Sequence, residues 1–519
     1  MPRSFNTSGP CIPGEHYMLP PERRLGRVQE LIEERKYFTL HAGRQTGKTT
    51  SLMWLEQHLN DSGRWRAVWI DLETAREQPD PARALAVVVK GIDRAFRLRH
   101  AALARPDMAE IEEALREPET AVLNYLARLS ALADRPLVLL LDEADGLVGP
   151  AMVSFLTQLR QGYIERSKAP FPSSVVLVGQ RQVRDYVLGT EDRQAVSWLG
   201  TTSPFNITAE AATLGPFTEA EVEELLGEHT ADTGQRFAPA AVHRIWELGR
   251  GHPWLTSALA DQIVRRDAKD RGIAITELHV ETAKETLILE RRSHIDSLVA
   301  RLREPRVRRI LSPMLAGTSL PADQIDDDVG YLLGLGLVRV EHGELQIANP
   351  IYREVIPRAL AWTQQISMHH PTEWYVRPDG ALDMPKLMAA WQAFWRKDGH
   401  LAAEGFGYRE AGAHLMLMAF LQRIVNGGGR VEREYGLGRG ALDLMIFWQG
   451  ARHAIEVKIR RDTETELEAL EQIGRYLDHA VLGEGWLVMF DLRKDPSWAD
   501  KQFIREVEHA AKKIFIVGC

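Results

Sequence analysis

Two groups of residues that could do chemistry stand at opposite ends of this 519-residue chain. Near the N-terminus, residues 42–49 read AGRQTGKT, which combines small residues with a lysine and two hydroxyl side chains. Near the C-terminus, Asp443 precedes the triplet Glu456-Val457-Lys458. The first group has the residue types that bind nucleotide phosphates, and the second has those that bind a metal ion and hydrolyse a phosphodiester.

A strand and a helix are predicted on either side of the N-terminal group. Tyr37–His41 read as a short apolar strand, and residues 49–60 as an amphipathic helix. In this context, backbone N–H groups of the turn and of the helix N-terminus surround a phosphate. Lys48 would neutralise the β- and γ-phosphates, and the Thr49 hydroxyl would hold Mg²⁺. The predicted ATP-binding residues are Gly43, Arg44, Gln45, Thr46, Gly47, Lys48, Thr49 and Thr50.

A second motif supports this prediction. Five consecutive aliphatic residues, Leu137–Leu141, end in Asp142 and Glu143. Such a run is typical of a central parallel strand that is buried on both faces. We expect Asp142 to join Thr49 at Mg²⁺, and Glu143 to orient or deprotonate the attacking water. The two acids could instead merely cap a loop, but both motifs in this order favour nucleotide binding.

Two further strands are predicted in the same part of the chain. Ala67–Leu72 and Ser174–Gly179 are apolar and contain β-branched residues. Arg181 follows the second of them, where a polar residue can sense the γ-phosphate. Arg181 could equally be a surface arginine. We predict that it contributes to the nucleotide site.

The middle of the chain has the pattern of a winged helix. Residues 304–317 and 321–338 read as helices, and residues 339–347 as two strands that turn at His342-Gly343. Three arginines could contact DNA phosphates, but Asp326-Asp327-Asp328 would repel them. We therefore favour a module that couples the nucleotide state to neighbouring domains over one that binds DNA. The three arginines are Arg306, Arg308 and Arg309.

A hairpin is predicted around the C-terminal group. Residues 442–448 and 453–459 read as strands that flank a short polar turn. Side chains alternate between the two faces of a strand. We therefore expect Asp443, Glu456 and Lys458 to share one face.

The chemistry of this face follows from its residue types. Pairing Trp448 with His453 across the turn would place Asp443 opposite Lys458. The carboxylates of Asp443 and Glu456 would hold Mg²⁺, or Mn²⁺ in its place. Lys458 would orient or activate water and stabilise negative charge that develops at phosphorus.

Residues on two predicted helices could complete the C-terminal centre. Residues 409–424 read as an amphipathic helix, on which Glu410 could add a metal ligand. Gln472 and Tyr476 lie four residues apart on a later helix, and therefore on one face of it. They could contact a nucleotide of the substrate or organise the metal ligands. Positive charge that could follow a phosphate backbone comes from Arg430, Arg433, Arg439, Arg460 and Arg461.

The N-terminal two thirds of the sequence resemble a known group of ATPases. The segments that carry the resemblance are 16–24, 41–50, 139–145, 177–181, 214–226 and 249–260. On these segments the sequence resembles the AAA+/STAND-like prokaryotic ATPases. The resemblance implies an ATP-dependent switch that forms homo-oligomers and has a helical lid and a winged helix. It also places Pro253, in Gly251-His252-Pro253, in the lid near the nucleotide base, and Arg181 at the strand tip.

The C-terminal region from about residue 400 resembles the PD-(D/E)XK nuclease superfamily. The matching residues are Asp443, Glu456, Lys458 and the helix-borne Glu410, with Gln472 and Tyr476 in the Gln-x-x-x-Tyr pattern of its exonuclease-like branches. Leu442 stands where the superfamily often has proline. The resemblance implies a metal-dependent nuclease.

We therefore predict a multidomain α/β protein. It would contain an ASCE-type P-loop ATPase core with a parallel sheet, a helical lid, a winged helix, a linker and a restriction-endonuclease-like α/β domain. A capping box at Thr218 and Glu221 would open the lid. The predicted domain ranges are 1–217, 218–275, 276–360, 361–400 and 401–519 in that order.

The composition fits a protein of the reducing cytoplasm. Two cysteines, Cys11 and Cys519, argue against a disulfide framework. We expect neither a signal peptide nor a membrane span, because the apolar runs are too short. The net charge of −8 means that nucleic acid would contact a local basic surface.

The first functional hypothesis is an ATP-regulated, Mg²⁺-dependent nuclease that acts on DNA. A role in prokaryotic defence or DNA processing is an analogy with proteins of this build. The alternative is a regulatory switch that binds nucleic acid or protein through a nuclease-like domain without cutting. A third hypothesis is a motor that translocates on DNA.

Overall fold

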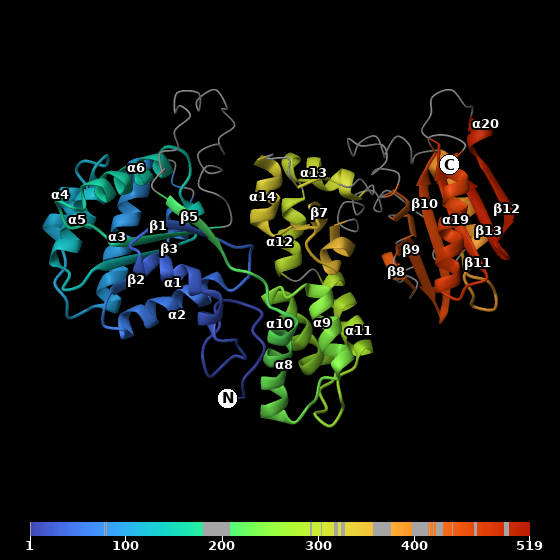
Figure 1. The fold of residues 1–519 in the computed structure, drawn as a ribbon, viewed down its shortest axis with the longest axis horizontal. Coiled ribbons are helices and arrows are strands. Elements are labelled where there is room, and N and C mark those ends of the chain that lie inside the picture. The colour runs from blue at the N-terminus through green and yellow to red at the C-terminus, as the bar shows by residue number, and fades with distance from the viewer. Residues whose placement is uncertain are drawn as a thin grey trace. The chain divides into compact units, whose positions relative to one another are not determined.

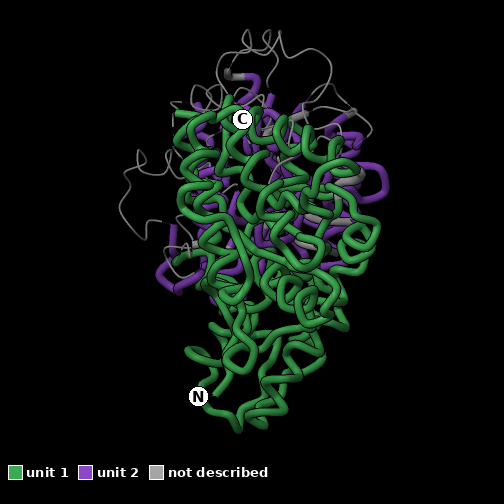
Figure 2. The backbone as a smooth tube through the Cα atoms, turned by 90° about the vertical axis from the view of Figure 1, so that its left-hand side faces the viewer, with its two compact units in different colours: residues 1–294, 325–339 green, residues 295–324, 340–519 purple. Residues whose placement is uncertain are grey.

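The computed structural model of the chain divides into two compact units. Unit 1 comprises Met1–His294 and Ile325–Arg339, and unit 2 comprises Ile295–Gln324 and Val340–Cys519 (Figure 2). The five predicted domain ranges stay predictions. The structure describes residues 2–519 apart from 77, 79, 180–207, 291–292, 303, 316–319, 323–326, 357–374, 397–413, 415, 419, 422–428, 438–439, 461–463 and 492–497.

Unit 1 is built on a five-stranded parallel sheet. Its strands are β1 (Tyr37–His41), β2 (Arg66–Asp71), β3 (Leu137–Asp142), β4 (Ser174–Gly179) and β5 (Thr208–Thr213), in the order β2-β3-β4-β1-β5. Figure 1 labels β1, β2, β3 and β5 of this sheet. All residues of β1, β3 and β4 are buried, as expected for central strands of a parallel sheet. The strands predicted from these apolar runs are therefore confirmed, and β2 begins and ends one residue earlier than predicted.

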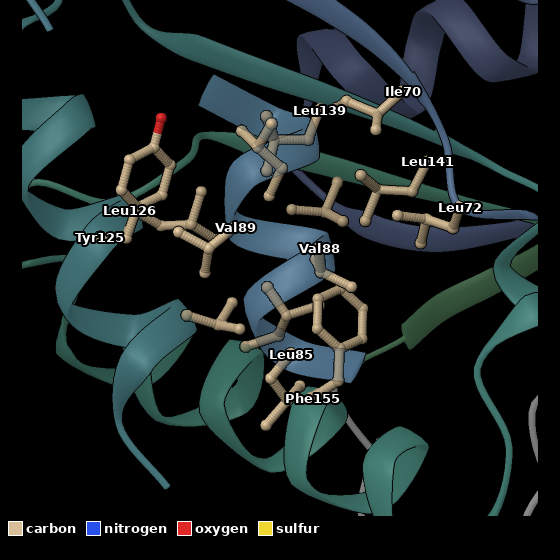
Figure 3. Close-up of a cluster of buried hydrophobic side chains, with 14 of the residues drawn as sticks. Ile70, Leu72, Leu85, Val88, Val89, Tyr125, Leu126, Leu139, Leu141 and Phe155 are labelled. Atoms are coloured by element: carbon tan, nitrogen blue, oxygen red, sulfur yellow. The ribbon is translucent and has the colours of Figure 1, made fainter. Parts of the chain in front are cut away.

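Helices cover both faces of this sheet, because its central strands are apolar on both sides. On one face, Val88 and Phe155 pack into a cluster with Leu139 and Leu141 of β3 (Figure 3). On the other face, a second cluster contains Val138 and Leu140 of the same strand. The helices are α3 (Pro81–Arg99), α4 (Met108–Ala114), α5 (Ala121–Leu132) and α6 (Gly149–Glu165) beside the first cluster, and α1 (Gly26–Glu33) and α2 (Lys48–Asp61) beside the second.

Four helices follow the sheet, and we call residues 218–289 the lid. They are α8 (Glu219–Thr233), α9 (Pro239–Gly249), α10 (Pro253–Gln262) and α11 (Glu277–Leu289). This segment extends past the predicted lid range of 218–275, because its last helix packs against the two helices before it. The predicted capping box is confirmed. The Thr218 hydroxyl accepts from the Glu221 N–H at 3.3 Å, and the Glu221 carboxylate accepts from the Thr218 N–H at 2.8 Å. Reciprocal capping fixes the point at which the lid leaves the core.

The next elements follow the predicted order of helices and strands. They are α12 (Ser293–Arg301), α13 (Pro305–Leu315), α14 (Asp327–Leu335), β6 (Val338–Glu341) and β7 (Glu344–Ile347). The strands β6 and β7 form a two-stranded sheet. The turn between them has left-handed backbone at His342 (φ 52°) and Gly343 (φ 83°), which two-residue hairpin turns favour. The winged-helix fold stays a prediction.

The C-terminal part of unit 2 contains a six-stranded mixed sheet. Its strands are β8 (Arg430–Leu437), β9 (Gly440–Trp448), β10 (Ala451–Ile459), β11 (Glu484–Phe490), β12 (Phe503–His509) and β13 (Lys512–Gly518), in the order β12-β13-β11-β10-β9-β8. The strands β10, β11 and β13 are parallel to one another. The helices beside the sheet are α16 (Met384–Phe394), α19 (Glu464–His479) and the short α20 (Trp498–Lys501).

Each face of this sheet has its own core because side chains alternate along the strands. Met445 and Ala454 lie in a cluster with Ile473 of α19. Leu444 and Ile455 lie in the other cluster, with residues of α16. No helix among the described residues is long and apolar enough to cross a membrane.

The lid and the core meet at a glycine that cannot be enlarged. The N–H of Phe217 donates to the carbonyl of Gly251 at 2.8 Å. Gly251 has a φ of +71°, and a Cβ on it would lie 1.8 Å from the carbonyl oxygen of Phe217. A side chain at this position therefore requires both backbones to move.

We predict that Gly251→Ala destabilises unit 1 by about 2–4 kcal/mol, because of the overlap and the left-handed backbone. The matched control is Gly227→Ala within α8, where a Cβ meets no atom within 4 Å. That change should stabilise the helix by about 0.5–1 kcal/mol. Thermal unfolding followed by calorimetry measures both. A midpoint for Gly251→Ala at or above that of the unsubstituted chain would contradict the prediction.

Candidate functional site

The loop between β1 and α2 has the strand, turn and helix arrangement predicted for a phosphate cradle. Gln45 and Gly47 have left-handed backbone, with φ of 58° and 86°, and α2 begins at Lys48. The Thr46 hydroxyl donates to the carbonyl of Gly43 at 2.8 Å and closes the turn from within. The turn therefore keeps its shape through its own backbone and one hydroxyl.

Arg24 supports this loop from outside. Its guanidinium donates to the carbonyl of Thr46 at 3.0 Å and to the carbonyl of Gly215, in the segment that leads to the lid. It also lies 5.1 Å from the ring centroid of Phe217. Burial lowers the pKa of Arg24 to about 10, so the group stays charged at neutral pH. One arginine thus links the cradle to the lid connection.

Lys48 is buried inside the loop. Its Nζ donates to the carbonyls of Ala42 and Gly43, both at 3.1 Å. Burial lowers the pKa of Lys48, and the nearby Glu143 and Asp142 oppose that effect. An ammonium held at the cradle in this way can exchange a carbonyl for a phosphate oxygen.

Two oxygen ligands suitable for Mg²⁺ meet at the start of α2. The Thr49 hydroxyl donates to Asp142 Oδ2 at 2.8 Å. Burial raises the pKa of Asp142, while the bond from Thr49 lowers it. A hydroxyl and a carboxylate are hard oxygen donors, which Mg²⁺ prefers. These two predicted ligands therefore fit the ion.

Glu143 follows Asp142 at the strand end and lines the same pocket as Lys48. Its backbone is left-handed, with a φ of 48°. Burial, and then the charge of Asp145, raise the pKa of Glu143 to about 7. A carboxylate with such a pKa can accept a proton from water near neutral pH.

A pocket of about 320 Å³ opens over the cradle. Most of the predicted nucleotide-binding residues line it. They are Arg44, Gln45, Gly47, Lys48, Thr49, Thr50, Glu143 and Pro253. Gly43 and Thr46 belong to the same turn, and Arg181 lies outside the described residues.

The sequence reasoning missed part of the pocket wall. The missed residues are 6–11, Glu73, Arg76, Trp254 and Ser257. The N–H of Cys11 donates to the Thr50 hydroxyl at 2.9 Å, and the Trp254 indole donates to the carbonyl of Thr7 at 2.9 Å. Carboxyl ends of neighbouring parallel strands meet at one edge, and this rule could have drawn attention to the residues after β2.

Two histidines, the partly buried His252 and the buried His294, lie between the lid and the cradle. His252 caps α10, since its Nδ1 accepts from the N–H of Leu255 at 3.4 Å. Its ring lies 4.7 Å from that of His294, which stacks on Trp254 at 5.0 Å. Burial lowers the pKa of His252 to about 4, and a hydrogen bond to the backbone of Arg44 opposes this. His252 is therefore neutral at pH 7 and contacts the cradle directly.

In unit 2 the predicted hairpin register was wrong by two residues. The pairs run from Trp448 with Ala451 to Leu444 with Ile455. The cause is a tight turn at Gln449-Gly450, where both residues have positive φ. Continuing this register places Asp443 opposite Glu456 instead of opposite Lys458.

The predicted common face survives this correction because the shift is an even number of residues. Lys458 Nζ lies 2.7 Å from Glu456 Oε1. Asp443 Oδ2 accepts from the N–H of Val457 at 2.8 Å. The structure therefore brings Asp443, Glu456 and Lys458 together.

Burial and charge shift the protonation of this centre. Glu456 is fully buried, and burial and the charge of Asp443 raise its pKa to about 7, against the effect of Lys458. Burial tends to lower the pKa of Lys458, but Glu456 and Asp443 outweigh it and the pKa is raised. The carboxylates of Asp443 and Glu456 are oxygen ligands of the kind that a divalent cation prefers.

The structure describes two of the three residues that were predicted to complete this centre from neighbouring helices. Gln472 donates to the Tyr476 hydroxyl at 3.0 Å on α19. Tyr476 also contributes, after burial and the two carboxylates, to the shifted pKa of Lys458. The helix α19 therefore brings the Tyr476 side chain toward the centre. Glu410 lies outside the described residues. Among the residues that the structure describes, no group of three or more His, Cys, Asp and Glu side chains could hold a metal ion.

The described arginines give little further information on a basic surface near this centre. Arg460 follows β10, and its N–H donates to the carbonyl of Phe490 at 2.8 Å. Arg439 and Arg461 lie outside the described residues, as do the side chains of Arg430 and Arg433. The predicted basic track along a phosphate backbone stays a prediction.

Several solved structures are similar to this chain at low sequence identity. The Walker-type ATPase of Pyrococcus abyssi is 16% identical with a TM-score of 0.48, over 68% of this chain and 99% of that chain. The Orc1 protein of Aeropyrum pernix, solved in complex with DNA, is 16% identical with a TM-score of 0.35, over 69% and 96%. A RuvB variant of Thermotoga maritima is 15% identical with a TM-score of 0.34, over 65% and 95%.

No curated protein matches the sequence significantly. A match to a protein family, in contrast, extends over residues 15–357 and carries the description AAA-like domain. This range includes the cradle, the Asp142-Glu143 strand end and the lid. The chain therefore belongs to the AAA-like domain family of P-loop ATPases.

Proposed function

We propose that the protein is an ATP-regulated, Mg²⁺-dependent nuclease that hydrolyses phosphodiester bonds of DNA. The observation that carries the proposal is the buried Glu456, paired with Lys458 at 2.7 Å and facing Asp443 on the same side of a sheet. The same chain contains an AAA-like domain. Paired carboxylates and an ammonium form a set suited to phosphodiester hydrolysis.

The role of each side chain follows from its charge. Asp443 and Glu456 would hold Mg²⁺, or Mn²⁺, which supplies Lewis-acid polarisation of the phosphate. The pKa of Lys458 is raised, so the side chain stays charged at neutral pH. It is therefore suited to stabilise negative charge at phosphorus and to orient water, and not to remove a proton. Gln472 and Tyr476 would position the substrate.

A purely structural ion pair accounts less well for this arrangement. A buried ion pair contributes little net stability, because desolvation costs about as much as the charges gain. A second carboxylate beside the pair adds repulsion, and burial together with this repulsion raises the pKa of Glu456. Unfavourable charge arrangements of this kind are common at functional sites.

The nucleotide half of the proposal rests on the cradle. Lys48 would bind the β- and γ-phosphates, Thr49 and Asp142 would hold Mg²⁺, and Glu143 would accept a proton from the attacking water. Arg181 is proposed to sense the γ-phosphate. The hydroxyl-to-carboxylate distance of 2.8 Å between Thr49 and Asp142 supports a shared ligand site.

Nucleotide state has a direct route to the middle of the chain within unit 1. A Cβ on Gly43 would lie 3.1 Å from the carbonyl oxygen of Leu335, the last residue of α14. A phosphate-induced shift of the cradle would therefore displace α14. We infer that ATP binding regulates DNA cleavage in two ways, by this contact and by the assembly of homo-oligomers. The protein would act in the cytoplasm, in defence against foreign DNA or in DNA processing.

The alternative function is a switch that binds nucleic acid or protein through the C-terminal domain without cutting. Among the described residues, the C-terminal centre has two carboxylates and no group of three or more metal-binding side chains. Cleavage assays separate the two functions.

We predict that the purified chain cleaves linear or circular DNA with Mg²⁺ and that Lys458→Ala slows cleavage by about 100-fold or more, because charge stabilisation at phosphorus is lost. The matched control is Lys513→Ala, which removes an exposed lysine that pairs with Glu506 at 3.0 Å. Product formation on gels measures both. Full cleavage by Lys458→Ala would reject the assignment, and no cleavage by the unsubstituted chain would favour the switch.

We predict that Lys48→Ala weakens ATP binding by about 100-fold and changes the effect of ATP on DNA cleavage, because the cation that neutralises the phosphates is removed. Lys90→Ala, an exposed lysine of α3, is the control. Calorimetric titration with ATP gives the affinity, and the cleavage assay with and without ATP gives the regulation. If ATP changed DNA cleavage equally in Lys48→Ala and in the unsubstituted chain, ATP binding at the cradle would not regulate cleavage.

A further inference from the structure

Arg76 occupies a place in the nucleotide pocket that the functional assignment so far leaves unused. It directly follows a short 3-10 helix, η2 (Glu73–Ala75), at the end of β2. Arg76, Glu73 and Glu143 all line the pocket. A cation in the wall of a phosphate-binding pocket can contact the ligand.

The backbone fixes where Arg76 lies relative to Glu143. β2 and β3 pair in parallel with Asp71 beside Asp142, so both chains leave the sheet at the same edge. The segments that follow pack closely, since a Cβ on Gly146 would lie 2.6 Å from the carbonyl oxygen of Leu72. The N–H of Arg76 donates to the carbonyl of Glu73 at 2.9 Å.

The ion pairs of Arg76 are loose. Its Nη2 lies 3.6 Å from Glu143 Oε2 and 3.9 Å from Glu73 Oε1, and its side chain is 44% exposed. Ion pairs this long and this exposed contribute little energy and can be exchanged at low cost. Lys48, in contrast, is buried and already donates to two carbonyls.

A third phosphate changes the charge balance beside Glu143. The charges of Asp145 and Asp142 already repel the Glu143 carboxylate, so another anion would add to this repulsion. A guanidinium has five donors in a planar fork and binds phosphate oxygens well. ADP lacks the terminal phosphate, so with ADP the pair between Arg76 and Glu143 can persist.

We propose that Arg76 determines the preference of this pocket for ATP over ADP, by exchanging the Glu143 carboxylate for the γ-phosphate. The exchange frees Glu143 to accept a proton from water while the water oxygen bonds to the γ-phosphorus. The bond from that phosphorus to the bridging oxygen breaks, and its electron pair stays with ADP. The proposal rests on the ATPase half of the proposed function and is independent of DNA cleavage.

The test compares Arg76→Ala, Arg76→Lys and the full-length unsubstituted chain by calorimetric titration with ADP and with a non-hydrolysable ATP analogue. In Arg76→Ala we expect ADP affinity within about twofold of the unsubstituted chain, and analogue affinity lower by about tenfold or more. ATP turnover should fall by about tenfold or more in kcat. Arg76→Lys should recover part of the analogue affinity, because it keeps the charge.

The control is Arg83→Ala, an arginine of α3 that is 80% exposed and pairs with Asp80. An equal loss of ADP and analogue affinity in Arg76→Ala would assign Arg76 a structural role and overturn the proposal, as would no loss at all. If the unsubstituted chain hydrolyses ATP but Arg76→Ala changes the affinities for ADP and for the analogue equally, only the role of Arg76 is rejected and the ATPase function stands. If Arg76→Ala loses affinity for the analogue but not for ADP, and the unsubstituted chain does not hydrolyse ATP, the role of Arg76 in ligand preference is supported and ATP hydrolysis is rejected.

Discussion

The common carboxyl edge of the parallel strands is the constraint on which unit 1 depends. β1 leads into the cradle, β3 ends in Asp142, and β2 leads to Arg76, and the parallel register brings all three ends to one edge. The hydrogen bond from Thr49 to Asp142 then joins the start of α2 to the end of β3. A central strand can end in two carboxylates only because its apolar residues are buried on both sides and fix it in place.

Contacts with backbone groups connect the lid to the same edge of the sheet. Arg24 donates to carbonyls of Thr46 and Gly215, and the close approach of Phe217 to Gly251 leaves no room for a side chain. Backbone groups cannot adjust by changing rotamers, so the contact between Phe217 and Gly251 fixes the lid connection against the core. The N-terminal segment adds a second link, since Thr7 accepts from Trp254 while Cys11 donates to Thr50.

Local patterns predicted the parts of the structure that depend on local physics. The aliphatic runs of β1, β3 and β4 and the capping box at Thr218 were read correctly, because burial on both faces and capping leave direct marks in the sequence. The hairpin register was wrong because Gln449 adopts a positive φ, which glutamine seldom does and the sequence does not announce. Arg76 was missed because its pairing with Glu143, which lies 67 positions further along the chain, exists only after the sheet has formed.

The C-terminal centre is best understood through the charge that its sheet brings together. The register between β9 and β10, continued by one pair, places Asp443 opposite Glu456, and the Lys458 ammonium lies 2.7 Å from Glu456. Burying a carboxylate costs free energy that an apolar residue at the same position would not. The centre can relieve this cost by protonating Glu456, whose pKa is raised to about 7, or by binding a divalent cation. Because protonation and cation binding compete for the same carboxylates, occupation of the proposed metal site should strengthen as pH rises through neutrality, which is the behaviour expected of a metal-dependent hydrolytic centre.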